Sequence, residues 1–318
     1  MARAFNFDAL LPAEIAKKAE DVGARKCHLP FWSLLALAVL AGAFIALGAV
    51  FSTTVSAGAA GVLPFGIVRL LAGLVFCLGL ILVVVGGAEL FTGNALIGMA
   101  WASGLVSTPQ LLRNWLIVYL GNLLGAVATA ILLYLSQQYT FGNGAVGLTA
   151  LEIARIKTNL GFVQAVTLGI LCNGLVCLAV WLCLGARTTT DKILAIIFPI
   201  SAFVAAGFEH SVANMYYLPL GLLIKSDTTF LTAIGKSVSD YPSLTWTNFL
   251  LVNLLPVTIG NILGGVVLVG FTYWFIYLRP EVRTAPSLQA MRHENDPPRV
   301  LRKKEWHSKI DTLFKLDC

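Results

Sequence analysis

The chain has 318 residues, of which 58% are hydrophobic and only 12% are charged, and its mean hydropathy is +0.82. Because a typical soluble domain is about 25% charged, these values exclude an ordinary soluble protein and indicate an integral membrane protein. The net charge of +6 does not indicate nucleic-acid binding, because the basic residues concentrate near the two ends of the chain. The six cysteines show no CxxC or other metal-binding spacing, and we predict no metal and no cofactor.

Three parts follow one another along the chain. Residues 1–30 are polar to amphipathic and predict a short cytoplasmic helix that lies either on the membrane surface or on the protein itself. Residues 31–278 contain the apolar stretches and form the predicted transmembrane domain. Residues 279–318 are basic and too polar to cross a bilayer, and they predict a cytoplasmic tail that is either an amphipathic helix or a solvated extension.

Six apolar stretches are long enough to span a bilayer, which takes about 20 residues per helix. They cover residues 31–51, 70–106, 115–135, 160–184, 193–224 and 249–277. As straight helices, the second and fifth would measure roughly 55 and 48 Å, against a hydrocarbon core of roughly 30 Å. We therefore predict an all-α membrane protein in which transmembrane helices 2 and 5 are broken, where glycines and ionisable residues interrupt them.

The two halves of the chain share motifs. Glu89 and Asn94 in the second stretch precede Glu209 and Asn214 in the fifth by 120 residues, and Gly-Asn-x-Leu-Gly recurs in the third and sixth stretches at an offset of 139. Three spans per half is an odd number, so the pattern predicts an inverted 3+3 repeat. Ten Lys and Arg residues lie near span ends on the side of the termini and five on the other, which predicts cytoplasmic termini.

The ionisable residues at the breaks are the candidate site. Charged or titratable groups at bilayer depth are costly and usually mark a substrate or proton pathway, which favours a functional His210. We expect Glu89 and Glu209 to be structural, accepting hydrogen bonds from backbone N–H groups that the breaks expose. Thr92 either faces a substrate or caps the half-helix that follows it.

Three motifs resemble signatures of the formate/nitrite transporter family, and two further segments, Phe7-Asp-Ala-Leu-Leu-Pro12 and Phe271-Thr-Tyr-Trp-Phe-Ile-Tyr-Leu-Arg279, resemble those of bacterial formate channels. The three family motifs carry most of the resemblance. They are Glu89-Leu-Phe-Thr-Gly-Asn94, Gly207-Phe-Glu-His-Ser-Val-Ala-Asn-Met215 and Val257-Thr-Ile-Gly-Asn-Ile262. The resemblance covers residues 5–280. It implies an aquaporin-like six-helix protomer, a homopentamer in the lipid bilayer of the bacterial inner membrane, and a path for formate or a similar small anion through each protomer.

The resemblance also implies roles along that path. Thr92 and His210 are similar to its central polar residues. The other assignments are pore-lining asparagines at Asn173 and Asn261, a vestibule charge at Lys157, and apolar constrictions at Phe76, Leu80 and Phe203. From the residues alone, Phe76 and Leu80 are equally consistent with ordinary helix packing, and Lys157 with a solvated loop.

Two mechanisms remain open for a small carboxylate on this path. Lys157 and the positive ends of broken helices attract the anion, and its departure from water raises the pKa of the acid. His210 either supplies a proton, so that the neutral acid passes the apolar rings, or only donates a hydrogen bond to a passing anion.

Other functions fit the sequence less well. Nitrite or hydrosulfide is the alternative substrate, since both are small monovalent anions of weak acids. A membrane enzyme using His210 and Ser211 is disfavoured because adjacent residues do not face each other and no G-x-S-x-G motif is present. A scaffold that recruits partners through the tail is a third possibility, and we predict that the protein is not an enzyme.

Overall fold

The computed structural model describes residues 9–279. By its internal contacts the chain divides into two units, Met1–Leu278 and Arg279–Cys318, and the helices described below all belong to the first. The predicted basic tail lies outside the described residues except for Arg279.

All regular structure in residues 9–279 is helical, as the sequence predicts. In this part of the chain, six helical segments are long and apolar enough to span a membrane. The elements are α1 (Pro12–Cys27), α2 (Phe31–Ser56), α3 (Phe65–Gly86), η1 (Gly93–Leu96), α4 (Ile97–Ala102), α5 (Thr108–Leu135), η2 (Gln138–Thr140), α6 (Ala145–Thr158), α7 (Phe162–Gly185), α8 (Thr189–Ala206), α9 (Ser211–Ser226), α10 (Thr228–Ala233), η3 (Val238–Asp240), η4 (Asn248–Leu254), α11 (Leu255–Ile262), η5 (Leu263–Phe271) and α12 (Thr272–Tyr277).

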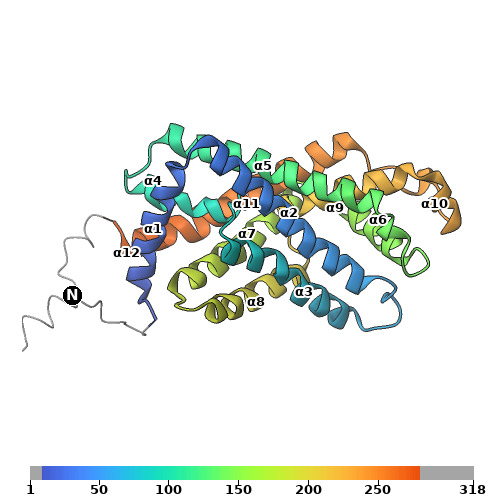
Figure 1. The fold of residues 1–318 in the computed structure, drawn as a ribbon, viewed down its shortest axis with the longest axis horizontal. Coiled ribbons are helices and arrows are strands. Elements are labelled where there is room, and N and C mark those ends of the chain that lie inside the picture. Colours follow the sequence, from blue (N-terminus) through green and yellow to red (C-terminus); the bar gives the residue numbers. More distant parts are fainter. Residues whose placement is uncertain (1–8, 280–318) are drawn as a thin grey trace, which may run out of the picture. The chain divides into compact units, whose positions relative to one another are not determined.

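The second half of the chain repeats the packing of the first. In the first half α2 packs against α3 and α5, and in the second half α7 packs in the same way against α8 and α11 (Figure 1). The two halves also contact each other: α9 of the second half packs on α5 of the first, and α4 of the first half packs on η5 of the second. The segment that follows each break is therefore held by the other half of the repeat.

Glycines bring helices into backbone contact at two matching places of the repeat, between α5 and α2 at Gly125 and between η5 and α7 at Gly264. A Cβ added at Gly125 on α5 would collide with the carbonyl of Val39 on α2. A Cβ at Gly264, which lies 139 residues further on, would collide with the carbonyl of Ile170 on α7. Small residues permit such close approach, which drives helix association in a bilayer where the hydrophobic effect is weak.

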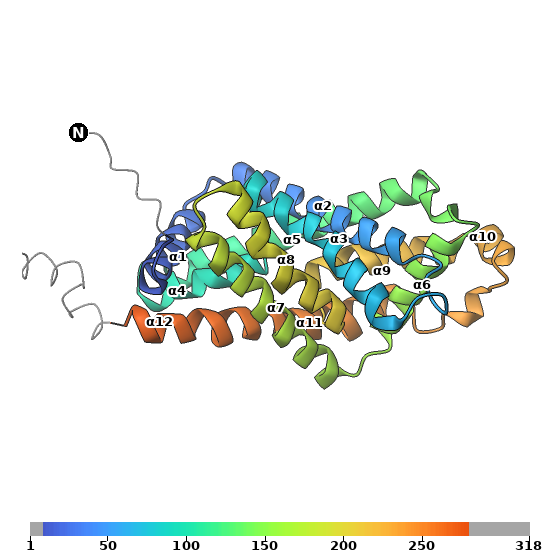
Figure 2. The ribbon, with the colours of Figure 1, turned by 90° about the horizontal axis from the view of Figure 1, so that it is seen from below.

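The last spanning segment, Asn248–Tyr277, continues from η4 to α12 and lies along α7 (Figure 2). It is not a uniform α-helix, because η4 and η5 on either side of α11 have the wider π-helical turn. Pro256, at the start of α11, has no N–H group and cannot complete the hydrogen-bond ladder there.

The amphipathic helix α1 lies against the protein, which is one of the two positions that its sequence allows. It packs on α4 and α7 (Figure 1), and a Cβ at Gly23 would lie 3.2 Å from the Cα of Ile97. Lys18 Nζ donates to the carbonyl of Leu184 at 2.7 Å, at the carboxyl end of α7. The carboxyl end of a helix carries partial negative charge, so a cation placed there is stabilising.

Candidate functional site

Both interrupted segments end their first half-helix in the same way. Gly87 follows α3 with φ 78°, and Gly207 follows α8 with φ 77°. Glycine is suited to this left-handed conformation because it has no Cβ to clash. Helical structure resumes at Gly93 in the first segment and at Ser211 in the second, so each leaves a short non-helical loop whose backbone groups need partners.

Asn122 on α5 supplies partners for the first loop. Its Oδ1 accepts the N–H of Phe91 at 2.9 Å, and its Nδ2 donates to the carbonyls of Glu89 at 3.0 Å and Ala38 at 2.7 Å. The side chain is fully buried. It therefore replaces the helical hydrogen bonds that the break removes.

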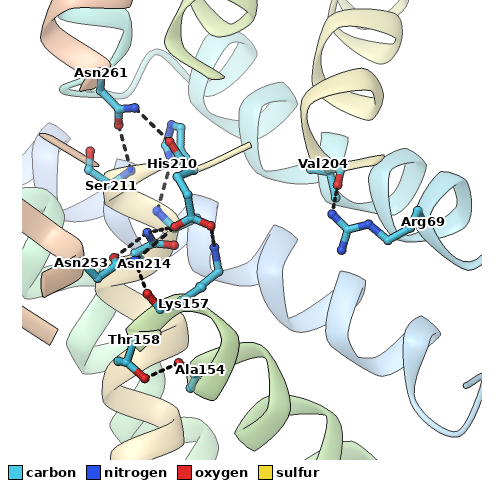
Figure 3. Close-up of polar contacts among 12 residues, drawn as sticks. Arg69, Ala154, Lys157, Thr158, Val204, His210, Ser211, Asn214, Asn253 and Asn261 are labelled. Carbon is cyan, nitrogen blue, oxygen red and sulfur yellow. Dashed lines mark hydrogen bonds and ion pairs between the residues drawn. The ribbon is translucent and has the colours of Figure 1, made fainter. Parts of the chain in front are cut away.

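Asn261 on α11 does the same for the second loop. Its Oδ1 accepts the N–H of Ser211 at 2.9 Å, and its Nδ2 donates to the carbonyls of Glu209 and Gly169, each at 2.9 Å (Figure 3). Although Asn261 is expected to line the pore, these contacts direct its amide towards the backbone of the break. We call Asn122 and Asn261 the clamp asparagines.

The first loop also belongs to a buried ionic network. Lys26 on α1 pairs with Glu89 at 3.1 Å and donates to Asn94 Oδ1 at 2.8 Å. Asn94 Nδ2 donates to Glu89 at 2.8 Å and to Asn114 Oδ1 at 3.0 Å, and Asn114 Nδ2 donates to the Lys26 carbonyl at 3.1 Å. The expectation that Glu89 accepts backbone N–H groups of the break is wrong, because its carboxylate binds the side chains of Lys26 and Asn94 while Asn122 accepts the N–H of Phe91.

An equivalent network surrounds the second loop. Lys157 on α6 pairs with Glu209 at 2.7 Å, and Asn214 Nδ2 donates to Glu209 at 2.7 Å and to Asn253 Oδ1 at 2.7 Å (Figure 3). Asn253 Nδ2 donates to the Lys157 carbonyl at 3.0 Å. The Lys157 and Glu209 side chains are only 14% and 6% exposed, which places Lys157 in a buried ion pair instead of a solvated loop.

The two loops meet at Thr92 and His210. Thr92 Oγ1 lies 3.0 Å from His210 Nε2, and both residues are buried. His210 also caps α9, because its Nδ1 accepts the N–H of Ala213 at 3.1 Å. A backbone N–H can only donate, so Nδ1 carries no proton in this arrangement, and a neutral ring has its proton on Nε2, directed at Thr92.

Asn173 on α7 lies behind this contact. Its Nδ2 donates to the carbonyl of Thr92 at 3.2 Å and to the backbone carbonyl of Asn261 at 2.6 Å. The amide therefore connects the first loop to α11, and it fixes the position of Thr92 through the main chain.

Two cavities border different stretches of α3, one lined by Ala72 and Phe76 and the other by Leu80 and Val83. His210 lines one of them, whereas Gly93, the neighbour of Thr92, lines the other. The Lys157 cavity has a volume of about 160 Å³ and includes Ser52, Ser56, Arg69, Phe76, Lys157, Phe203, Glu209, His210 and Tyr217. The Lys26 cavity has a volume of about 220 Å³ and includes Lys26, Leu80, Glu89, Gly93 and Asn94.

The residues expected at the apolar constrictions are divided between these cavities. Phe76 and Phe203 line the Lys157 cavity, with ring centroids 5.6 Å apart, and Phe203 stacks on the His210 ring at 5.9 Å. Leu80, one turn beyond Phe76 on α3, lines the Lys26 cavity. Each cavity is therefore lined in part by apolar side chains expected at the constrictions.

Several members of the site are not predicted from the sequence. Lys26 counted only towards membrane topology, and Asn114, Asn122 and Asn253 received no role. The offset of 139 that relates the third and sixth spans also relates Asn114 to Asn253 and Asn122 to Asn261. Extending the repeat along these spans would have found the asparagines. Nothing local in the sequence links Lys26 to Glu89.

The described residues contain no group of three or more His, Cys, Asp and Glu side chains that could hold a metal ion.

Comparisons with known proteins agree with this architecture. Residues 13–275 match the sequence profile of the formate/nitrite transporter family. The chain is 48% identical over 275 residues to the formate channel FocA of Escherichia coli (strain K12), covering 86% of this chain and 96% of FocA. It is 38% identical to the formate channel FocB of the same organism, covering 88% of this chain and 100% of FocB. A solved pentameric formate channel with formate bound superposes with a TM-score of 0.74 at 44% identity, covering 78% of this chain and 98% of that one. This chain belongs to the formate/nitrite transporter family.

Proposed function

We propose that this protein is a membrane channel for formate and related small monocarboxylates. The observation that carries the proposal is the Thr92–His210 contact, which joins two broken segments that line two cavities, each with its own lysine–glutamate pair. The relatives support formate as the substrate, since FocA and FocB are named formate channels and the similar solved structure contains formate.

The path runs from one lysine cavity to the other. A carboxylate that enters the Lys157 cavity meets a cation and the amino-terminal end of α9, both of which attract anions. It then passes Phe76 and Phe203 to reach the hydrogen-bonding groups of Thr92 and His210, and leaves past Leu80. The apolar side chains exclude hydrated ions, and the polar pair replaces part of the hydration that the carboxylate loses.

His210 acts in this proposal as a neutral hydrogen-bond donor through Nε2. Protonation of the ring would place a hydrogen on Nδ1 and break the cap to Ala213, and it would add a positive charge at the positive end of α9, which the helix dipole disfavours. Of the two mechanisms open from the sequence, the geometry therefore favours donation to the passing anion over delivery of a proton by the ring.

The assembly and location follow the relatives. We propose a homopentamer in the bacterial inner membrane with both termini in the cytoplasm, based on the pentameric neighbour and on the distribution of Lys and Arg. Large exposed apolar side chains on α2, α5 and α7, among them Leu40, Leu124 and Leu171, suit contact with lipid or with other protomers. The protein transports its substrate without chemical conversion in this proposal.

Flux through purified protein in proteoliposomes tests the substrate. We expect formate uptake that exceeds uptake of nitrite or hydrosulfide, and a His210→Phe variant that loses most of it because the Nε2–H donor is gone. Uptake of nitrite or hydrosulfide without formate uptake would reject the substrate. Full formate uptake by His210→Phe would remove His210 from the path.

A further inference from the structure

Arg69 is a charged residue of the Lys157 cavity that neither the sequence pattern nor the repeat assigns to the site. It lies one turn into α3 and is half-buried. Its Nη2 donates to the carbonyl of Val204 (Figure 3), and its Nε donates to the carbonyl of Ala205 at 3.2 Å. These carbonyls belong to the last turn of α8, where the helix dipole places partial negative charge. The guanidinium therefore offsets a charge that would repel an anion from this cavity.

Arg69 keeps donors for a ligand after making these contacts. A guanidinium has five N–H groups in a planar fork, and the contacts to α8 use Nε and Nη2 only. None of the ion pairs found between residues 9 and 279 involves Arg69. Lys157 in the same cavity is paired with Glu209 at 2.7 Å. Arg69 is thus the cation of this cavity whose charge is not balanced by a carboxylate among the described residues.

Among the described residues, the lining of the Lys26 cavity contains no counterpart of Arg69. Its charged lining residues in the described part of the chain are Lys26 and Glu89, which pair at 3.1 Å and cancel. The Lys157 cavity holds Arg69, Lys157 and Glu209, which leaves one positive charge when His210 is neutral. The repeat makes the two lysine networks alike. Among the described residues, Arg69 therefore accounts for the difference in net charge between the Lys157 cavity and the Lys26 cavity.

We propose that Arg69 is an anion-binding residue, and that it makes the Lys157 cavity bind small monovalent carboxylates more tightly than the Lys26 cavity does. Arginine suits this role because its planar fork matches the two oxygens of a carboxylate and its charge persists at every physiological pH. The proposal rests on the proposed function and deepens it, since it assigns different affinities to the two ends of one path.

Currents through the channel in a planar bilayer, with formate added to one side at a time, test this asymmetry. We expect Arg69→Met to raise the half-saturating formate concentration about tenfold on the Lys157 side, equivalent to about 1.4 kcal/mol, and to leave the value on the Lys26 side unchanged. Arg69→Lys, which keeps the charge but loses the fork, should give an intermediate shift on the Lys157 side. Added salt should weaken binding more in the unaltered channel than in Arg69→Met, because salt screens the charge.

The control is Arg155→Gln, which removes a positive charge from α6 on the same side as Lys157. Arg155 pairs with Glu152 at 2.8 Å and does not line the cavity, so its loss should shift neither value. The Lys26-side value measured in the same Arg69→Met channels reports whether that variant folds. Equal shifts on both sides, or no shift with Arg69→Met, would overturn the proposal while formate still flows. Absence of formate current in the unaltered protein would instead reject the proposed function.

Discussion

Replacement of Asn261 by leucine isolates the contribution of a clamp asparagine to the broken helix. Leucine has the branching and the number of side-chain non-hydrogen atoms of asparagine, so it keeps the shape of the side chain while the amide is lost. The side chain makes three hydrogen bonds to backbone groups, with the Ser211 N–H and with the carbonyls of Glu209 and Gly169. All three groups lie in or beside the second break.

The expected loss in free energy of unfolding depends on which of these three backbone groups keep a hydrogen-bond partner. A buried hydrogen bond contributes about 1 kcal/mol, and a buried polar group left unpaired costs about 1–3 kcal/mol. The carbonyl of Gly169 lies within α7 and keeps its helical bond, whereas the Ser211 N–H and the Glu209 carbonyl lie at the break and lose a partner. We therefore expect Asn261→Leu to lower the free energy of unfolding by about 3–5 kcal/mol.

Denaturation of the purified protein in detergent, followed by circular dichroism, measures this loss, and proteoliposome flux measures its effect on transport. Asn122→Leu should behave similarly, because Asn122 makes the equivalent contacts to Phe91 and Glu89 in the first break. Asn248→Leu is the control for an asparagine with a single side-chain donation, to the Ser243 carbonyl at 2.7 Å, and should cost about 1 kcal/mol. Unaltered stability and flux in Asn261→Leu would refute the assignment of a clamp.

Three further predictions concern the ion pair, the central contact and pH. Lys157→Met should lower the free energy of unfolding by about 3–5 kcal/mol, because Glu209 stays buried without its cation. Adding Glu209→Gln should restore part of that free energy in the same unfolding assay. If the double variant is no more stable than Lys157→Met, the two residues do not form a buried ion pair. Thr92→Val, which removes the hydroxyl but little volume, should lower formate flux about tenfold, the equivalent of one hydrogen bond of about 1.4 kcal/mol, whereas unchanged flux would exclude the hydroxyl from the path. The N–H of Phe230 and then the hydroxyl of Tyr139 hold the pKa of Asp227 below its usual value, so its stabilising effect should be complete above the pKa of an unfolded aspartate and lost as pH falls through the lower folded pKa. Thermal melts from pH 7 to pH 3 should show a smaller loss of stability in Asp227→Asn than in the unaltered protein, and an equal loss would contradict this role of Asp227.

The helical plan of the protein was predictable from local properties of the chain. Hydropathy located six spans because a bilayer sets one length for every apolar helix, and the excess length of two stretches indicated where they break. The repeat was visible because Glu89 and Asn94 recur at one fixed offset in Glu209 and Asn214. His210 stood out since a titratable group in an apolar run is rare.

The use of each polar side chain was decided only by tertiary structure. Lys26 reaches Glu89 across 63 positions, and Arg69 reaches the end of α8 across 135 or more. Neither contact leaves a periodic signal in the sequence, because each joins two segments that lie far apart along the chain and meet only when the helices pack. Asn261, expected to face the path, has its amide on the backbone of the break. Which groups a buried amide or cation meets depends on the helices that surround it, and local sequence does not contain that information.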